Sequence, residues 1–141
     1  MRIGRFIACA VAAAAAAGVS GAAGAVRADR TPPVFAGLRA ATTCLAGPAG
    51  GDRASSYRLV WAAARDESTR QRRIVYDVYQ AASPGAERFA RPTYTSRPGA
   101  TSFVTPPLSS TGSHYFVVRA RDAAGNRDRN RRERLGVNLC V

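Results

Sequence analysis

The run over residues 114–130, HYFVVRARDAAGNRDRN, constrains the fold more than any other part of the sequence. Apolar and charged residues alternate along its first half, and the alternation stops at Ala124-Gly125-Asn126, residue types that favour turns. A period of two places alternate side chains on opposite faces of a β-strand and does not fit an amphipathic helix. The residues expected to face a core are Phe116, Val118 and Ala120, and those expected to point to water are Arg119 and Arg121. The run therefore predicts a half-buried strand that leads into a polar hairpin turn.

The rest of the chain also has the pattern of short strands separated by turn signals, with no long segment of helical period. Besides the strand just described, the predicted strands cover residues 35–42, 57–61, 74–79, 88–95, 101–105 and 135–139. The alternation places Trp61, the only tryptophan, inside, and Asp77 marks a face that points to water. The residues predicted to form the core are Trp61, Tyr76, Val78, Phe116 and Val118. About seven short strands at this spacing predict an all-β fold, an immunoglobulin-like sandwich of two antiparallel sheets.

The N-terminal segment has the layout of a secretory signal peptide. Two arginines within the first five residues precede an apolar stretch over residues 6–17, and small residues follow it. Cleavage would fall after Ala25 or Ala28, and we favour Ala28, which makes Asp29 the first mature residue. An uncleaved anchor is the alternative, since about 20 apolar residues span a bilayer. The predicted parts are a signal peptide (1–28), a proline-containing leader (29–33) and one domain (34–141), in a protein that is secreted to the extracellular space or the periplasm.

Cysteine usage agrees with export. Removal of the signal peptide takes Cys9 with it and leaves Cys44 and Cys140, an even pair for an oxidising compartment. One disulfide is the simplest interpretation, and closing so long a loop would stabilise the fold by roughly 4 to 5 kcal/mol in the chain-entropy model. The alternatives are two free thiols or a metal pair, and two cysteines without a neighbouring histidine make a poor zinc site.

The chain is strongly basic, and its basic residues are all arginine. Loss of Arg2, Arg5 and Arg27 with the signal peptide leaves 18 arginines against nine acidic residues, a net charge of +9. This charge favours acidic partners, through a long-range attraction that salt screens. The alternative is an ordinary solvated surface in which a coding bias has replaced every lysine by arginine.

Several segments, taken together in their order, resemble the bacterial form of the fibronectin type III domain. They are Pro32-Pro33-Val34-Phe35-Ala36-Gly37-Leu38, Leu59-Val60-Trp61, Tyr76-Asp77-Val78-Tyr79, Leu108 and Val118-Arg119-Ala120-Arg121-Asp122-Ala123-Ala124-Gly125-Asn126. The resemblance covers residues 32–139 and implies that family's topology. Two features depart from the family. His114 stands where a tyrosine usually makes a corner hydrogen bond, so that either its imidazole or a shifted Tyr115 would make the bond, and the cysteine pair is not a usual feature of the family. The implied topology places the two cysteines at the same pole.

The same resemblance implies that the loops after the second and the sixth strand emerge together at the other pole. These loops carry nine arginines, Arg65, Arg70, Arg72, Arg73, Arg127, Arg129, Arg131, Arg132 and Arg134. The candidate binding residues among them are Arg70, Arg72, Arg73, Arg127, Arg129, Arg131 and Arg132. Ion pairs with the acidic residues of the same loops would neutralise part of this charge.

Nothing in the sequence forms a recognisable catalytic constellation. The chain has one histidine, and it has no glycine-rich phosphate cradle, no serine nucleophile motif and no paired-carboxylate cleft. The spacing Asn126-x-Asp128-x-Asn130 departs from a calcium loop, since Arg131 stands where the loop requires glycine. We therefore expect no enzyme, no cofactor and no metal site.

These observations predict an exported, non-catalytic module of fibronectin type III type that acts in binding, in adhesion or as a spacer. The expected partner is a protein or an anionic cell-surface polymer, with no specific nucleic acid and with membrane contact only through an uncleaved signal peptide. The module is expected to be a monomer. The alternative is a small secreted basic effector or inhibitor that uses the arginine-rich loops on an acidic target.

Overall fold

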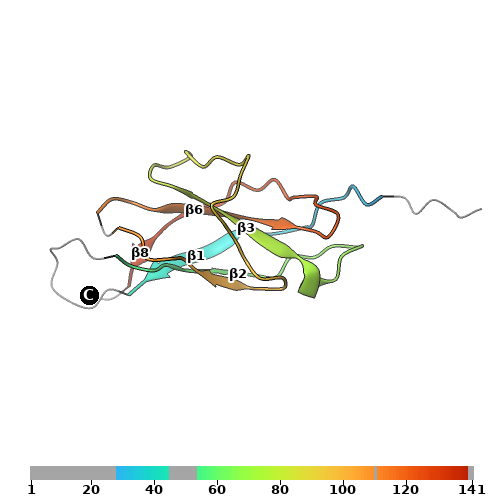
Figure 1. Cartoon of the computed structure of the whole chain (residues 1–141), viewed down its shortest axis with the longest axis horizontal. Helices are drawn as coiled ribbons and strands as arrows, with labels where there is room; N and C mark the ends of the chain where they lie inside the picture. Colours follow the sequence, from blue (N-terminus) through green and yellow to red (C-terminus); the bar gives the residue numbers. More distant parts are fainter. Residues whose placement is uncertain (1–27, 45–53, 110, 140–141) are drawn as a thin grey trace, which may run out of the picture.

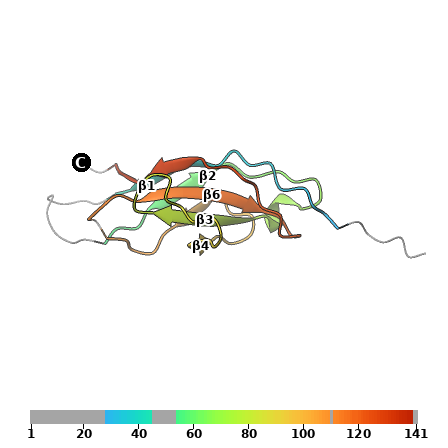
Figure 2. The same ribbon diagram turned by 90° about the horizontal axis from the view of Figure 1, so that it is seen from above.

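The computed structural model describes residues 28–44, 54–109 and 111–139, which form two packed layers of β-sheet (Figures 1 and 2). The strands are β1 (Leu38–Thr43), β2 (Arg58–Trp61), β3 (Val75–Ala81), β4 (Tyr94–Thr95), β5 (Ser102–Val104), β6 (Tyr115–Arg121), β7 (Glu133–Leu135) and β8 (Val137–Asn138), and one turn of 3-10 helix, η1 (Gln71–Arg73), precedes β3. One sheet has the order β5-β2-β1-β8 and the other β4-β3-β6-β7. The prediction of an all-β, two-sheet sandwich is confirmed.

The core lies between the sheets and is built from the alternate positions of the strands. The predicted core residues Trp61, Tyr76, Val78, Phe116 and Val118 are all buried there, together with Leu38, Leu59 and Ile74. The Trp61 and Tyr76 rings, one from each sheet, lie 5.1 Å apart between centroids. The Trp61 indole N–H donates to the Ala100 carbonyl at 2.9 Å, so its polar group is satisfied as it is buried.

The last strand passes from one sheet to the other at Gly136, which the sequence prediction of a single strand over 135–139 did not include. Residues before Gly136 pair with β6, and those after it pair with β1 in the parallel direction. The Tyr57 ring occupies the space beside Gly136, where a Cβ atom would lie 2.4 Å from Tyr57 Cε1. The sandwich therefore has eight described strands in place of about seven, and one of its strand pairs is parallel.

The second sheet is covered on its outer face as well. The expected strand over residues 88–95 is reduced to β4, and the segment before it folds over β3 and β6. Phe89 of this segment packs edge-on against Tyr79 with ring centroids 5.1 Å apart, and the Arg119 guanidinium lies 3.6 Å from the Phe89 centroid. Tyr79 and Val117, which point away from the core, are consequently buried.

Asp77, Arg119 and Arg121 point to this outer face, but the prediction that they extend into water is wrong. Asp77 is fully buried, and the two arginines are only partly exposed. The cause is the cover on the outer face: Arg119 lies on Phe89 and Arg121 lies on Asp77.

The His114 imidazole makes the corner contact that the sequence left open between His114 and Tyr115. Its Nε2 lies 2.8 Å from the Ser109 carbonyl oxygen and its Nδ1 lies 3.2 Å from Gln80 Nε2. A carbonyl oxygen only accepts and an amide nitrogen only donates, so the neutral tautomer protonated at Nε2 satisfies both contacts. The ring also packs edge-on against Tyr57.

The predicted signal peptide lies outside the described residues apart from Ala28. Within the described part of the chain, no helix has the length and apolar character needed to cross a membrane.

Candidate functional site

Four segments meet at one end of the sandwich, where β2 and β6 end and β3 begins; we call this end the loop pole (right-hand side of Figure 1). The segments are residues 28–37 before β1, the β2–β3 connection with η1 (62–74), the β4–β5 turn (96–101) and the β6–β7 turn (122–130). Hydrogen bonds join them: Val34 pairs with Arg65, Ala123 N donates to Thr69 Oγ1, and Asn126 Nδ2 donates to the Asp29 carbonyl. The segments of the loop pole are therefore hydrogen-bonded to one another and are not independent loops.

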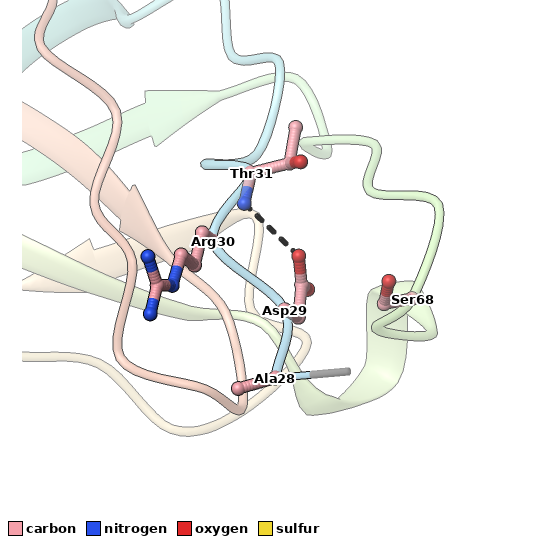
Figure 3. Close-up of a pocket in the computed structure, with 5 residues that line it drawn as sticks. All are labelled: Ala28, Asp29, Arg30, Thr31 and Ser68. Atoms are coloured by element: carbon pink, nitrogen blue, oxygen red, sulfur yellow. Dashed lines mark hydrogen bonds between the residues drawn. The ribbon is translucent and has the colours of Figure 1, made fainter. Parts of the chain in front are cut away.

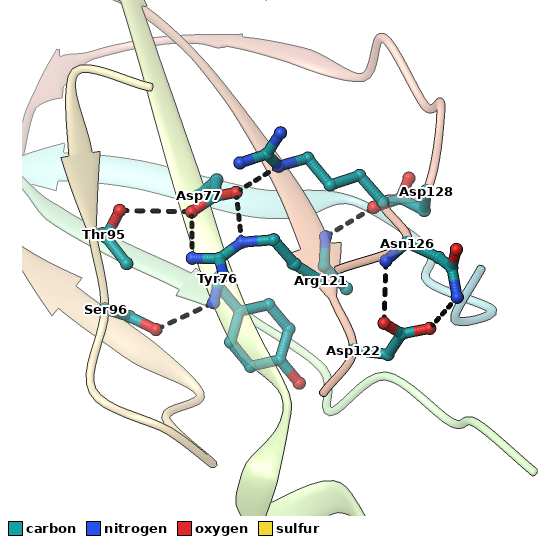
Figure 4. A network of polar contacts seen from close by, with 10 residues as sticks. Tyr76, Asp77, Thr95, Ser96, Arg121, Asp122, Asn126 and Asp128 are labelled. Atoms are coloured by element: carbon teal, nitrogen blue, oxygen red, sulfur yellow. Dashed lines mark hydrogen bonds and ion pairs between the residues drawn. The ribbon is translucent and has the colours of Figure 1, made fainter. Parts of the chain in front are cut away.

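The buried Asp77 carboxylate anchors the β6 side of the loop pole (Figure 4). It accepts hydrogen bonds from Arg121 Nε at 2.9 Å, Arg121 Nη2 at 3.2 Å, Arg127 Nε at 2.7 Å and Thr95 Oγ1 at 3.1 Å. Burial alone would raise the pKa of Asp77, but the hydrogen bonds and charges of the two arginines outweigh it and hold the pKa below its ordinary value. Arg127, a candidate binding residue, is thus already engaged in an ion pair.

The acidic residues of the β6–β7 turn bind amide groups and not arginines (Figure 4). Asp122 Oδ1 accepts from the Asn126 backbone N–H at 2.8 Å, and its Oδ2 accepts from the Asn126 side chain at 2.7 Å. Asp128 accepts from the backbone N–H groups of Ala120 and Asn130. Burial raises the pKa of Asp128 despite these bonds. The Asn126-x-Asp128-x-Asn130 spacing therefore serves to shape the turn.

The chain that follows this turn runs back along β6, and three of its arginines pack against the protein. Arg131 lies over the outer side of Phe89, with its guanidinium 5.6 Å from the ring centroid. Arg132 Nη1 donates to the Ala36 carbonyl at 3.1 Å, and Arg134 Nε donates to the Arg39 carbonyl at 3.1 Å. The nine arginines that the family topology was expected to gather at one end are therefore divided, and several of them pack against the protein itself. Arg129 is exposed.

The arginines of the β2–β3 connection stay at the loop pole. Arg70, Arg72 and Arg73 are exposed on and beside η1, which buries none of its own residues. The β4–β5 turn packs against η1 and adds a fourth exposed arginine, Arg97, which the sequence analysis did not select. We call these four residues the η1 patch. Arg97 was missed because it comes from a turn far along the chain, and only the packing of Gly99 on Arg72 places it there.

Three carboxylates from separate segments also come together at the loop pole. Oxygen atoms of Asp29, Asp66 and Asp122 lie within 4.8 Å of one another. Carboxylate oxygens are the ligands that hard cations prefer, but each of these groups already accepts from an amide: Asp29 from Thr31 N, and Asp66 from Ser68 N. An adjoining pocket (Figure 3) is lined by Ala28, Asp29, Arg30, Thr31 and Ser68. The expectation of no metal site rested on local spacing, which does not detect a grouping of this kind.

The opposite end of the sandwich carries Cys44, one of the two cysteines of the predicted disulfide. Cys44 directly follows β1, and Cys140 lies outside the described residues, so the bridge stays a prediction. The parallel pairing of Thr43 with Asn138, and the hydrogen bond from Leu139 N to the Thr43 carbonyl at 3.0 Å, bring the chain alongside Cys44 one residue before Cys140.

No family model, no curated protein and no solved structure matches this chain. The resemblance to fibronectin type III domains therefore stays a prediction, and the functional argument rests on the residues themselves.

Proposed function

We propose that this chain is an exported, non-catalytic binding or spacer module of fibronectin type III type that attaches to an acidic partner through its surface arginines. The strand order, the corner bond of His114 and the two loops that meet beside β3 and β6 support the family assignment. The function does not follow from the fold, which suits many roles, and rests on the distribution of charge.

The observation that carries the proposal is the way in which the acidic side chains are used. Asp77 is the one acidic residue in the described part of the chain that forms ion pairs with arginine, and its two partners are Arg121 and Arg127. Asp29, Asp66, Asp122 and Asp128 accept from amide groups, and Glu133 accepts from the backbone N–H of Gly85. None of these five acids forms an ion pair, so most of the exposed arginines have no direct counter-ion within the described part of the chain. A surface of this kind attracts polyanions at long range.

The proposal includes the predicted export and the predicted disulfide, since a small module with one bridge suits an oxidising compartment. We expect N-terminal sequencing of the exported protein to give Asp29 as the first residue. Intact mass with an alkylating agent, before and after reduction, is expected to label Cys44 and Cys140 only after reduction. A start at Met1 with membrane retention would support the anchor, and two reactive thiols in the native protein would remove the bridge.

Binding is tested with the purified exported protein on immobilised anionic polymer and on the same matrix without charge. We expect retention on the anionic matrix that falls steeply with salt, because surface charges are screened within about 8 Å at physiological ionic strength. Retention that is equal on both matrices, or unaffected by salt, rejects charge-driven attachment. Saturable binding to one acidic protein, with no retention on any polymer, favours the effector or inhibitor alternative.

A further inference from the structure

We infer that the η1 patch, Arg70, Arg72, Arg73 and Arg97, is a contact surface for a linear polyanion whose charged units carry no aromatic bases, such as an acidic or phosphate-bearing polysaccharide. The inference rests on the proposed attachment to an acidic partner and specifies both the surface and the class of ligand.

The two backbone segments that carry the four arginines are joined to each other. Gly99 N donates to the Ile74 carbonyl at 2.8 Å, and Gln71 Nε2 donates to the Gly99 carbonyl at 3.0 Å. Gly99 has a φ of +74°, in the left-handed region, and a Cβ atom there would lie 3.0 Å from Arg72 Cα. Only glycine combines this conformation with so close an approach. The turn that carries Arg97 is therefore fixed against η1.

The patch is also available for binding. Its four side chains are exposed and make no hydrogen bond or ion pair with any residue of the described chain. Asp66, a partly buried acidic residue of the same connection, accepts hydrogen bonds from the Ser68 and Thr69 backbone N–H groups. Arg121, Arg127 and Arg132, by contrast, are bound to Asp77 or to a backbone carbonyl. The guanidinium groups of the patch keep the paired N–H donors that bind the oxygens of phosphate, sulfate or carboxylate groups.

The class of ligand follows from what surrounds the arginines. A protein surface for single-stranded nucleic acid combines positive charge with exposed aromatic rings on which bases stack. Every aromatic side chain in the described part of the chain is buried or partly buried, and Trp61 and Tyr76, the rings of the strands next to η1, lie in the core. Charge without a stacking platform fits a polymer that presents repeated oxyanions and no bases.

The experiment compares two quadruple variants that lose the same charge. One replaces the η1 patch (R70A, R72A, R73A and R97A), and the matched control replaces four exposed arginines elsewhere whose side chains also make no hydrogen bond or ion pair within the described part of the chain (R39A, R58A, R88A and R91A). The probes are inorganic polyphosphate, dextran sulfate and polygalacturonate, with a single-stranded DNA of equal charge as the base-bearing comparison. Dissociation constants are measured at low and at physiological salt. The three polyanions show which oxyanion is preferred.

We expect the dissociation constant of the patch variant to rise at least about tenfold, and that of the control to stay within about threefold of the original protein. The slope of log K against log salt concentration is expected to become smaller by roughly 0.7 for each lost contact in the patch variant. Equal weakening in both variants assigns the binding to diffuse charge and overturns the inference while the proposed function stands. Absence of binding by the unaltered protein to every polymer rejects the proposed function itself. Single-stranded DNA that binds more tightly than the other polymers at equal charge overturns the ligand class.

G99A, which keeps every charge but displaces the turn, is expected to weaken binding by a smaller factor, and unchanged binding there would show that the position of Arg97 does not matter.

Discussion

Replacing Asp77 by asparagine tests the outer-face network most directly, because it keeps the shape of the side chain and removes the charge. The carboxylate lies under Arg121 and Arg127 and receives four hydrogen bonds in all, including one from Thr95. In the variant, two guanidinium groups lose their counter-ion beside a covered sheet face. The result is expected to be a loss of stability without a change of fold, since the inner core is untouched.

The size of the loss follows from burial. Removing one partner of a fully buried ion pair costs about 3 to 5 kcal/mol. Asp77 is fully buried, but the side chains of Arg121 and Arg127 are 29% and 41% exposed and can regain water. We therefore expect D77N to lower the free energy of unfolding by about 2 to 3 kcal/mol, against a total of about 5 to 15 kcal/mol for a domain of this kind. T95V, which removes only the hydrogen bond from the Thr95 hydroxyl to the carboxylate, is expected to cost about 1.5 kcal/mol.

The pH dependence of the free energy of unfolding tests whether Asp77 acts as a charged group. The folded pKa of Asp77 lies below the ordinary value of 3.8, so the folded state favours the charged form. The stability that this carboxylate contributes is fully present above the unfolded pKa and is lost as the pH falls through the folded pKa. Burial raises the pKa of Asp128 and Glu87, whose contributions change with pH in the opposite direction. The quantity to follow is therefore the difference between the original protein and D77N, in which these other groups cancel.

Urea unfolding followed by the fluorescence of Trp61, the single buried tryptophan, measures this difference. Urea is preferred to guanidinium salts, which would screen the ion pairs. The difference is expected to be constant from pH 5 to 7, as estimated from ordinary carboxyl values, and to shrink as the pH falls below about 4. A D77N cost below about 0.5 kcal/mol, or one that stays the same at low pH, would refute the account of Asp77 as a charged anchor.

Three further variants test other features of the fold. G136A places a Cβ against the Tyr57 ring and is expected to cost about 2 to 3 kcal/mol in urea unfolding, with a smaller cost when Tyr57 is leucine; an equal cost in both backgrounds rules out the steric explanation. H114A removes the bond to the Ser109 carbonyl and is expected to cost about 1 to 2 kcal/mol, whereas H114Y, which restores a hydroxyl donor, is expected to lose less; identical losses would show that the corner bond has no role. E87Q removes a buried carboxyl whose pKa is raised, first by burial and then by contact with its neighbour Glu133, so it should raise stability at pH 7 and flatten the fall in stability above pH 4.5; a variant less stable at pH 7 contradicts this.

The inner face of the sandwich is predictable from sequence because its signal is local. Trp61, Tyr76 and Phe116 each lie in a strand whose apolar residues alternate, and the period of two assigns them to one face without knowledge of the partner strand. The break at Gly136 is not local in this sense. It depends on Tyr57, which lies on another strand, so the sequence pattern shows one strand where the structure has two.

The outer face of the second sheet was misassigned because the alternation rule assumes that one face is wet. Asp77 does mark the outward face, as the pattern indicated, but outward did not mean exposed. The signal that was available is the apolar character of two other outward residues, Tyr79 and Val117, which a solvated face has no reason to carry. Phe89, in a segment without a strand pattern, covers them.

Coding bias and specific binding answer different questions about the arginines. A bias explains why every basic residue is arginine, but it does not explain which arginines remain without a partner. In the described part of the chain, Asp66 and Asp122 accept from backbone N–H groups and form no ion pair with Arg70, Arg72 or their neighbours. A charged surface therefore arises here from the way turns satisfy their amides, and the position of its free arginines depends on residues, such as a left-handed glycine, that carry no charge at all.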